Sequence, residues 1–568
     1  MSNQSDFNDK VKTEGERPVK KVLENPKEPD KDPTQTERLI QIARRAELFH
    51  SPNKEPFASI PVDDHWETFT LKYSGFTRWL YHDYYQQTGS APHSQAKTDA
   101  LATIESIAQF DGPEKPVHVR TASIDGNIWV DLANENWDAV KITPDGWEVV
   151  KNPPVKFIRP GGMLPLPMPQ SGGSISQLKP FLNYEQESDF RLMVGFIIGA
   201  YHPSGPYAIL ILQGGRGTAK STGSKVIRSL IDPNQAPTRT RPRNEEELAI
   251  AAENSRVIAL DNLSGAPVWL SDALCRLSTG AGFSKRTLYT NRGEEIFQAK
   301  RPIILNGIDD IATRGDLQDR SLTLDLPRIE HYIDEEAFWP RFNRAYPQLL
   351  GAVFDAVSHA LRNVQETQLS LNKARMLDFA RWVTAAEPAL GWEHETFLAD
   401  YMENRSEAVE IGLGADVTAT AIRSLMTDHQ EWRGTATELI EALGEQVSDK
   451  VQNSKQFPNG RTLRGKQRRL APSLQQIGIE FEWEGNKERG SMYRLTKNNP
   501  NKPSEPSVTP ELLNDKGSEP EATLKQPDGL EGSEREPSGG KLLNHGDSEA
   551  TESTEAINKQ DVEGLWTE

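Results

Sequence analysis

The sequence predicts a multidomain α/β fold, and three observations support that prediction. An apolar run over residues 207–213 leads directly into a glycine-rich segment and a helical pattern, typical of a strand, turn and helix. Two Asp-Gly pairs, Asp125-Gly126 and Asp145-Gly146, each join two alternating runs, which is the signal of a β-hairpin. Near the C-terminal end, helical patterns precede two more alternating runs. We therefore expect an α+β segment, a central α/β core and a helix-and-hairpin module.

Composition sets the broad class of protein. A chain of 568 residues is long enough for two to four domains, while a hydrophobic content of 36% predicts disordered segments. Cys275 is the one cysteine, so an intramolecular disulfide is excluded, as is usual in a reducing cytoplasm. Neither a signal peptide nor an apolar run of 18 residues is visible in the sequence. We expect a cytoplasmic protein with no membrane partner.

Charge is unevenly distributed along the chain. The net charge is −18, and residues 498–568 hold 16 acidic and 6 basic residues, which is −10 of it. This tail is rich in Pro, Gly, Ser and Glu, so we expect it to be disordered and solubilising, or else a mimic of nucleic acid. The bulk charge therefore does not exclude a nucleic-acid partner.

Shifts in composition and pattern divide the chain into six expected segments. These are a disordered start (1–36), an N-terminal α+β accessory domain (37–180), an α/β core (181–330), a helical region (331–430), a basic module (431–497) and the acidic tail (498–568).

The segment after the run 207–213 has the pattern of a phosphate-binding P-loop. It consists of Gly214, Gly215, Arg216, Gly217, Thr218, Ala219, Lys220, Ser221 and Thr222. In such a loop, backbone N–H groups and the start of a helix point at a phosphate chain. Lys220 would reach the β- and γ-phosphates of ATP, and Ser221 would ligate Mg²⁺. Ala219 stands where the usual pattern has glycine, and a glycine-rich turn without a ligand is the alternative.

A second apolar run, residues 257–260, follows Arg256 and ends at Asp261. A buried strand that delivers a carboxylate at its end is where Mg²⁺ would bind beside a P-loop. The alternative is a core strand that ends in a surface aspartate. Asn262 follows where many motor ATPases have an acid, so hydrolysis would be slow or would use another carboxylate, such as Asp272.

A third apolar run ends at Asn306, whose amide would hold the attacking water or the γ-phosphate. Arg320 begins a further strand, and in ring-shaped ATPases an arginine there reaches the phosphate held by the neighbouring subunit. Arg314 competes for that role, and a solvated surface arginine is the alternative for both.

Two basic segments are candidates for DNA contact. Residues 283–297 read as a hairpin that carries Lys285, Arg286 and Arg292, although a plain surface hairpin is also compatible with them. In the C-terminal module, a short amphipathic helix over 435–443 and a second helix over 461–476, kinked or broken near Pro472, precede strands 479–483 and 491–495. This order resembles a winged helix-turn-helix, whose basic helix meets DNA phosphates or bases. The basic residues are Arg464, Lys466, Arg468 and Arg469; a solvated or protein-docking helix is the alternative.

The order of P-loop, Asp-ended strand, basic hairpin, Asn-ended strand and arginine resembles the superfamily 3 helicases, a branch of the AAA+ ATPases found in phages, plasmids and other mobile elements. The resemblance covers about residues 205–330. It implies an AAA+-type core with ATP and Mg²⁺ bound by Lys220, Ser221 and Asp261, Asn306 as sensor and Arg320 as finger. It also implies a hairpin that grips single-stranded DNA. Priming is not expected, because the N-terminal domain lacks a pair of aspartates on one strand.

These expectations describe an ATP-dependent DNA motor, most simply a replicative helicase that assembles as a homo-oligomeric ring such as a hexamer. Two other functions remain open. One is a nucleotide-gated DNA-binding switch or loader with slow hydrolysis, which Asn262 favours. The other is a regulatory or defence ATPase whose partner is a protein.

Overall fold

The computed structural model describes residues 32–497, except residues 73, 281–282, 287–293, 298, 309–310, 313, 371–374, 455 and 488–489. The acidic tail lies outside the described residues, as do residues 1–31, so their expected disorder stays a prediction. The first described helix, α2 (Gln35–Ala43), begins within the segment for which we expected disorder. Its start is fixed by a capping box, in which Thr34 and Glu37 each bond to the other's backbone N–H.

The N-terminal elements up to residue 111 enclose a core of their own. They are α2, β1 (Glu47–His50), β2 (Pro56–Val62), β3 (His65–Thr70), α3 (Ser74–Thr88), α4 (Ser94–Ser106) and the π-helix η1 (Ile107–Asp111). The three strands pair antiparallel in chain order. Buried residues such as Leu39, Phe76 and Ile104 fill the space between this sheet and its helices.

The predicted β-meander is present as β5 (Thr121–Ile124), β6 (Asn127–Asp131), β7 (Ala139–Thr143) and β8 (Gly146–Val150). At the first turn Asp125 and Gly126 both have positive φ, 51° and 76°, as a tight hairpin of this type requires. Beside the meander, β4 (Val117–His118) pairs parallel with β9 (Lys156–Phe157).

The meander shares its core with the central sheet, so no break between cores occurs at the expected boundary near residue 180. Val130 and Val140 belong to the same buried cluster as residues of β10 (Ile209–Gln213) and α10 (Glu335–Asn363). Arg120, at the start of the meander, is fully buried, and its Nε donates to Asp232 at 3.1 Å. An ion pair this deeply buried is costly to break, which ties the meander to the core.

The centre of the molecule is a parallel sheet in the order β11 (Ile258–Leu263), β14 (Ile303–Gly307), β10 (Ile209–Gln213) and β15 (Ser321–Asp325). Its strands are almost continuously apolar because both faces are covered. Leu210 and Leu212 of β10 pack into one core, and Ile209 and Ile211 into another. The associated helices are η2 (Ile175–Phe181), α5 (Glu187–Gly199), α6 (Lys220–Ser229), α7 (Glu245–Glu253), α8 (Val268–Thr279) and α9 (Gly315–Gln318).

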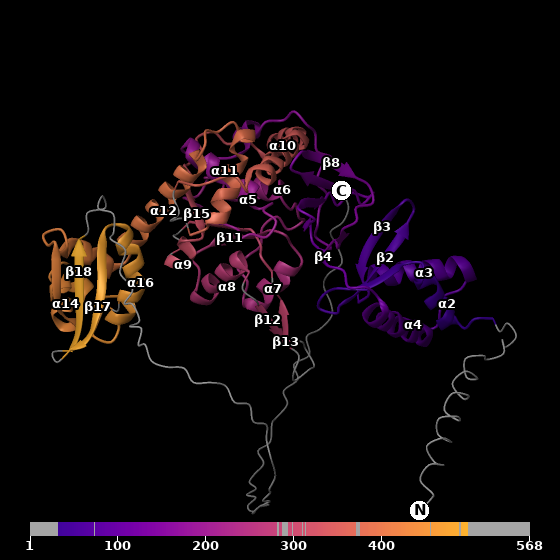
Figure 1. The fold of residues 1–568 in the computed structure, drawn as a ribbon, viewed down its shortest axis with the longest axis horizontal. Coiled ribbons are helices and arrows are strands. Elements are labelled where there is room, and N and C mark those ends of the chain that lie inside the picture. Colours follow the sequence, from indigo (N-terminus) through magenta and orange to yellow (C-terminus); the bar gives the residue numbers. More distant parts are fainter. Residues whose placement is uncertain are drawn as a thin grey trace, which may run out of the picture. The chain divides into compact units, whose positions relative to one another are not determined.

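A two-stranded antiparallel hairpin, β12 (Phe283–Arg286) and β13 (Glu294–Phe297), extends from the core beyond α7 and α8 (Figure 1). The helical region follows as α10 (Glu335–Asn363), α11 (Leu377–Leu390), α12 (Thr396–Ala415) and α13 (Val417–Leu425). α12 protects the free edge of β15, because the Asn404 amide bonds to both the N–H and the carbonyl of Thr323. Among the described residues, no helix combines the length and the apolar character needed to cross a bilayer.

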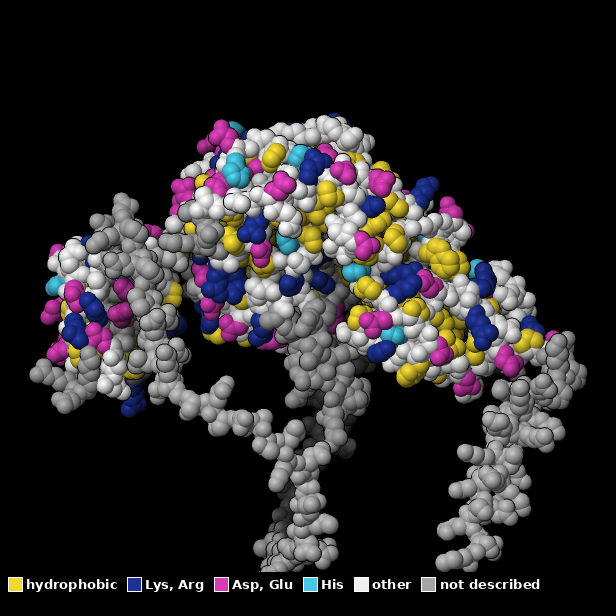
Figure 2. Space-filling view, viewed as in Figure 1, with side chains coloured by type: hydrophobic (Ala, Val, Ile, Leu, Met, Phe, Trp, Pro, Cys, Tyr) yellow, Lys and Arg dark blue, Asp and Glu magenta, His cyan; other side chains and the backbone are white. Residues whose placement is uncertain are grey.

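The C-terminal module consists of β16 (Glu431–Thr435), α14 (Ala436–Gly444), α15 (Asp449–Gln452), α16 (Leu463–Gln476), β17 (Ile479–Lys487) and β18 (Gly490–Lys497). Its antiparallel sheet has the order β16-β18-β17. Of the two alternatives expected near Pro472, a kink or a break, the break is wrong, since α16 runs through Pro472. Proline has no N–H to donate to the carbonyl one turn earlier in the helix. Because Pro472 is exposed, water can bond to that carbonyl instead. Acidic and basic side chains are interspersed on the visible face of the module (Figure 2).

Candidate functional site

The glycine-rich loop leaves the carboxyl end of β10 and turns into α6. Gly214 and Gly217 have φ of 137° and 78°, which only glycine adopts easily, and α6 begins at Lys220. β10 lies in the sheet between β14 and β15, and the chain reaches its next strand, β11, only by passing over β14. Crevices outside the carboxyl ends of parallel strands, where such connections diverge, are the usual ligand sites of α/β sheets.

Ala219 is the left-handed residue that ends the loop, with φ 54° and ψ 28°. A residue with a Cβ is strained in this conformation by about 1–2 kcal/mol, whereas glycine is not. An Ala219→Gly variant is therefore expected to be more stable than the natural chain by about 0.5–1 kcal/mol, once the greater freedom of unfolded glycine is subtracted. Urea denaturation measures this change.

Gly215→Ala is the matched control, because Gly215 lacks a positive φ and a Cβ there would meet only open space. It should be neutral or slightly stabilising. A destabilised Ala219→Gly variant would show that the methyl group contributes packing that exceeds the backbone strain.

Lys220 lies folded against its own loop. Its Nζ donates to the carbonyls of Gly214 and Gly215, both at 2.7 Å, and to Thr218 Oγ1 at 3.2 Å. Partial burial lowers the pKa of Lys220 from its ordinary value, while the negative charge of Asp261 opposes that shift. The ammonium group is thus held against the carbonyls of the loop, and a bound phosphate would take the place of those carbonyls as its partner.

Ser221 and Asp261 meet at the carboxyl edge of the sheet, as the sequence predicts. Ser221 Oγ donates to Asp261 Oδ1 at 3.2 Å, and Thr238 Oγ1 donates to the other carboxylate oxygen at 3.3 Å. A carboxylate and a hydroxyl suit Mg²⁺, which commonly takes one or two protein oxygens and completes its shell with phosphates and water. Across the described ranges, no group of three or more His, Cys, Asp or Glu side chains forms a protein-only metal site.

Thr238 is a residue that sequence reasoning missed. It precedes Arg239, which forms an isolated parallel bridge to Leu260 at the outer side of β11. One bridge leaves no alternating pattern in the sequence, so no signal marks Thr238 as a neighbour of Asp261.

Asn306 and Asn262 are joined by a hydrogen bond. The buried Asn306 side chain accepts the Asn262 N–H at 2.9 Å and donates to Ser224 Oγ at 3.1 Å. Asn262 has a left-handed φ of 56°, and its side chain is exposed. Asn306 therefore connects the ends of β11 and β14 to α6, which is a positioning arrangement, and its contact with water or a γ-phosphate stays a prediction.

Arg320 lies at the opposite edge of the sheet from the loop. It immediately precedes β15, whose first residue, Ser321, pairs with Ile209, while Gln213 pairs with Asp325. Four strand residues at about 3.3 Å each separate the two edges by about 13 Å. Arg320 therefore lies far from the glycine-rich loop of its own chain.

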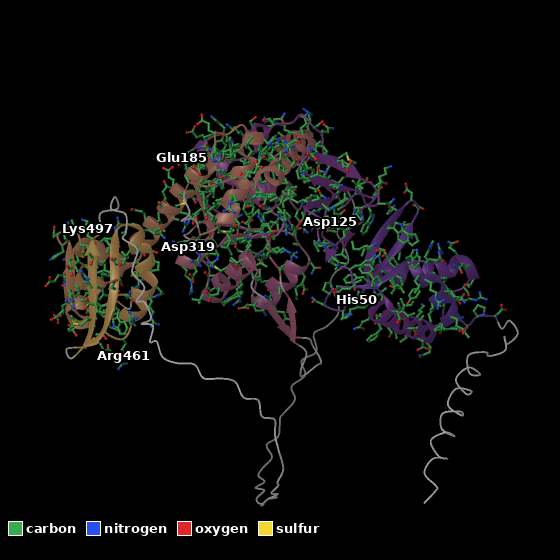
Figure 3. The ribbon with its side chains drawn as sticks, in the orientation of Figure 1. His50, Asp125, Glu185, Asp319, Arg461 and Lys497 are labelled. Atoms are coloured by element: carbon green, nitrogen blue, oxygen red, sulfur yellow. The ribbon has the colours of Figure 1, made fainter. Side chains whose placement is uncertain are left out.

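Residues near Arg320 in the chain form ion pairs with other side chains. Its own guanidinium donates to the Asp316 carbonyl at 2.6 Å. Asp319, labelled in Figure 3, pairs with Arg405 at 3.1 Å and Arg375 at 3.5 Å. The competing candidate, Arg314, pairs with Asp272 at 3.1 Å. Asp272 thus has a cationic partner, which disfavours it as the carboxylate that activates water.

The hairpin of β12 and β13 carries two of its three predicted basic residues within described strands. The register sets Lys285 opposite Glu295 and Arg286 opposite Glu294. Sequence reasoning did not include the acidic residues at these paired positions. Arg292 lies outside the described residues.

The predicted basic cluster on α16 divides into two kinds of residue. Lys466 is 16% exposed and pairs with Asp416 at 2.7 Å, while the Arg464 guanidinium lies 3.7 Å over the Trp483 ring. Arg464 therefore has its partner within the module, and Lys466 has its partner at the start of α13. Arg468 and Arg469 are exposed.

Arg461, just before the start of α16, is a further exposed cation. Sequence reasoning did not select it. It lies at the opposite end of the module from Lys497 (Figure 3).

Two family models match the chain, and together they cover more than half of it. Residues 175–401 match the actinomycete integrative conjugative element replication protein, and residues 418–510 match the C-terminal domain of the same RepA family. No curated protein matches the chain.

Solved structures give distant similarities. The active helicase Cch of SCCmec type IV has a TM-score of 0.44 and 10% identity, covering 79% of this chain and 92% of that one. The apo NrS-1 C-terminal region has a TM-score of 0.36 and 11% identity, covering 83% and 100%. The JCV helicase has a TM-score of 0.21 and 13% identity, covering 41% and 63%. These similarities are too distant to transfer an activity.

The fold and the family matches define a multidomain, mixed α/β replication protein. More particularly, its central and C-terminal parts match the replication-protein family of actinomycete integrative conjugative elements.

Proposed function

We propose that this protein is an ATP-dependent motor that acts on DNA during replication of a mobile genetic element, as a replicative helicase. The proposal rests on one observation: Ser221, in the glycine-rich loop, contacts Asp261 at the carboxyl edge of the sheet. Ser221 Oγ lies 3.2 Å from Asp261 Oδ1. A replication-protein family and a site suited to a nucleoside triphosphate together favour a motor.

In this proposal the loop and the residues beside it bind ATP and Mg²⁺. The backbone N–H groups of residues 214–222 and the start of α6 bind the phosphates of ATP, and Lys220 neutralises the charge that develops between the β- and γ-phosphates. Ser221 and Asp261 hold Mg²⁺, which supplies electrostatic stabilisation of the phosphoryl group when bound. Asn306 positions Asn262 and α6 beside the phosphates through its hydrogen bonds to the Asn262 N–H and to Ser224 Oγ.

We further propose a homo-oligomeric ring, with Arg320 acting on the nucleotide of the neighbouring subunit. The separation of about 13 Å or more between the sheet edges removes Arg320 from the phosphates of its own chain. In a head-to-tail ring, the loop of one subunit faces the opposite sheet edge of its neighbour, which is the edge that carries Arg320. An arginine that acts on the nucleotide of the neighbouring subunit requires this arrangement.

DNA contacts are assigned to the hairpin around Lys285 and Arg286 and to a winged helix that contains α16. Single-stranded DNA fits a hairpin within a ring, and a duplex or an origin fits the winged helix. On α16 the exposed cations are Arg468 and Arg469, preceded by Arg461, and these are the residues free to meet phosphates.

Replacing both Arg468 and Arg469 with alanine is expected to weaken duplex DNA binding and to flatten its dependence on salt. Two lost phosphate contacts should lower the slope of log K against log salt by about 2. Binding is measured by fluorescence anisotropy from low to moderate salt.

Arg433→Ala is the matched control for this variant, because Arg433 lies exposed in β16 and pairs with Glu484 at 2.8 Å. It should leave the salt slope unchanged. Absence of DNA binding by the natural chain at low salt would contradict the DNA assignment and favour a protein partner.

A second function, a nucleotide-gated DNA-binding switch, is favoured by one observation. The exposed side chain after Asp261 is the amide of Asn262, which cannot accept a proton as a carboxylate does. Such a switch would bind ATP tightly and hydrolyse it slowly, so turnover in the presence of DNA separates it from the motor.

A further inference from the structure

A short segment of the chain that follows β15 lies against the glycine-rich loop. Residues 327–334, here named the strap, connect β15 to α10. The strap starts beside the loop, since the N–H of Leu326, the residue just before it, bonds to the Gln213 carbonyl just before Gly214. No part of the phosphate-binding pattern in the sequence includes it.

Contacts at both ends hold the strap against the loop. The Ile329 N–H and the Tyr332 hydroxyl both donate to the Gly217 carbonyl, at 3.2 and 3.3 Å. The Asn183 amide donates to the carbonyls of Thr218 and Pro327, at 3.0 and 2.7 Å, so it joins loop and strap directly.

The fit at Gly217 leaves no space for a side chain. A Cβ at this position would lie 2.2 Å from the Tyr332 hydroxyl oxygen, and Gly217 also has a φ of 78°. Glycine is therefore required there both by the loop conformation and by the approach of the tyrosine.

Tyr332 nevertheless remains open to solvent. Tyr332 is 66% exposed, and the adjacent Ile333 is 52% exposed. Two large apolar side chains exposed next to each other, at a loop whose own residues are small or polar, form a surface that a flat ligand can cover. The loop itself offers phosphate ligands but no apolar surface to a base.

We infer that Tyr332 is the base-binding residue of the site and that it stacks on the purine of the bound nucleoside triphosphate. This inference rests on the proposed function, because it takes the loop as the phosphate site. Aromatic stacking engages the face of a base and leaves its hydrogen-bonding edge unread. The strap should therefore give ATP a higher affinity than pyrimidine nucleotides, whose bases have a smaller ring. It should discriminate little between ATP and other purine nucleotides.

The test compares two ligands that share the phosphates and differ in the base. ATP and inorganic tripolyphosphate are titrated, each with Mg²⁺, into the natural full-length chain and into Tyr332→Ala, Tyr332→Phe and Tyr85→Ala by calorimetry. Tyr85, on α3, is the control, since it is a similarly exposed tyrosine outside the loop.

Tyr332→Ala is expected to weaken ATP binding about tenfold or more and to leave tripolyphosphate binding unchanged, because stacking of one base is worth about 1–3 kcal/mol. Tyr332→Phe keeps the ring and should bind ATP within about twofold of the natural chain. Tyr85→Ala should change neither affinity.

Equal weakening of both ligands by Tyr332→Ala would overturn the inference, because the tyrosine would then only shape the loop through Gly217. Loss of ATP binding by Tyr332→Phe would overturn it as well, since the hydroxyl and not the ring would matter. If the natural chain binds neither ligand, the proposed nucleotide site itself fails, and the inference fails with it.

Discussion

A Lys220→Ala variant is expected to lose measurable ATP binding, with an affinity at least about 100-fold below that of the natural chain. Lys220 Nζ makes two hydrogen bonds of 2.7 Å to loop carbonyls, so the ammonium is already held where two phosphate groups would meet it. A hydrogen bond to a charged group is worth about 1.5–3 kcal/mol, and two such bonds account for the loss. Equilibrium binding of ATP with Mg²⁺ measures it.

Lys225→Ala is the matched control, because Lys225 lies on the same helix and pairs only at 3.7 Å with the exposed Glu335. It should bind ATP as the natural chain does. Unchanged binding by Lys220→Ala, in a variant whose circular dichroism spectrum is native, would show that the loop does not bind a phosphate chain.

The second large effect is expected from Arg320→Ala, which should reduce ATP turnover by about 1,000-fold or more while ATP affinity stays within about twofold. An arginine that stabilises phosphoryl transfer contributes on this scale to turnover. Affinity is spared because Arg320 lies at the far edge of the sheet from the loop of its own chain. Steady-state hydrolysis and equilibrium binding together measure the split.

Mixing two inactive variants tests whether Arg320 acts across a subunit interface. Subunits with Arg320→Ala keep an intact loop, and subunits with Lys220→Ala keep the arginine, so mixed rings should regain part of the turnover. Arg314→Ala is the comparison variant, because Arg314 already pairs with Asp272 at 3.1 Å. Loss of turnover in Arg314→Ala alone would transfer the role to that residue. No recovery on mixing would contradict action in trans.

Local patterns account for the parts of this fold that sequence reasoning predicted. The run that ends at Gln213 is a buried strand, and Asp125-Gly126 forms a tight turn, because strand burial and turn geometry depend on neighbouring residues. The approach of Ser221 to Asp261 was also predictable, since parallel strands bring their carboxyl ends to one edge.

Long-range pairings account for what the sequence could not show. Arg120 is buried against Asp232, 112 positions away, so the meander joins the central core instead of an N-terminal one. Lys466 bonds to Asp416, 50 positions away, which withdraws it from the surface of α16. The strap reaches Gly217 from 115 positions away through Tyr332. Charge and spacing along the chain carry no record of such partners.

The central claim, that ATP hydrolysis is coupled to DNA, is tested most directly by ATP turnover with and without single-stranded DNA in the natural chain and in Lys220→Ala. The motor predicts hydrolysis that DNA stimulates several-fold and that the substitution abolishes. Tight ATP binding with negligible turnover under either condition would contradict the motor and leave the nucleotide-gated switch.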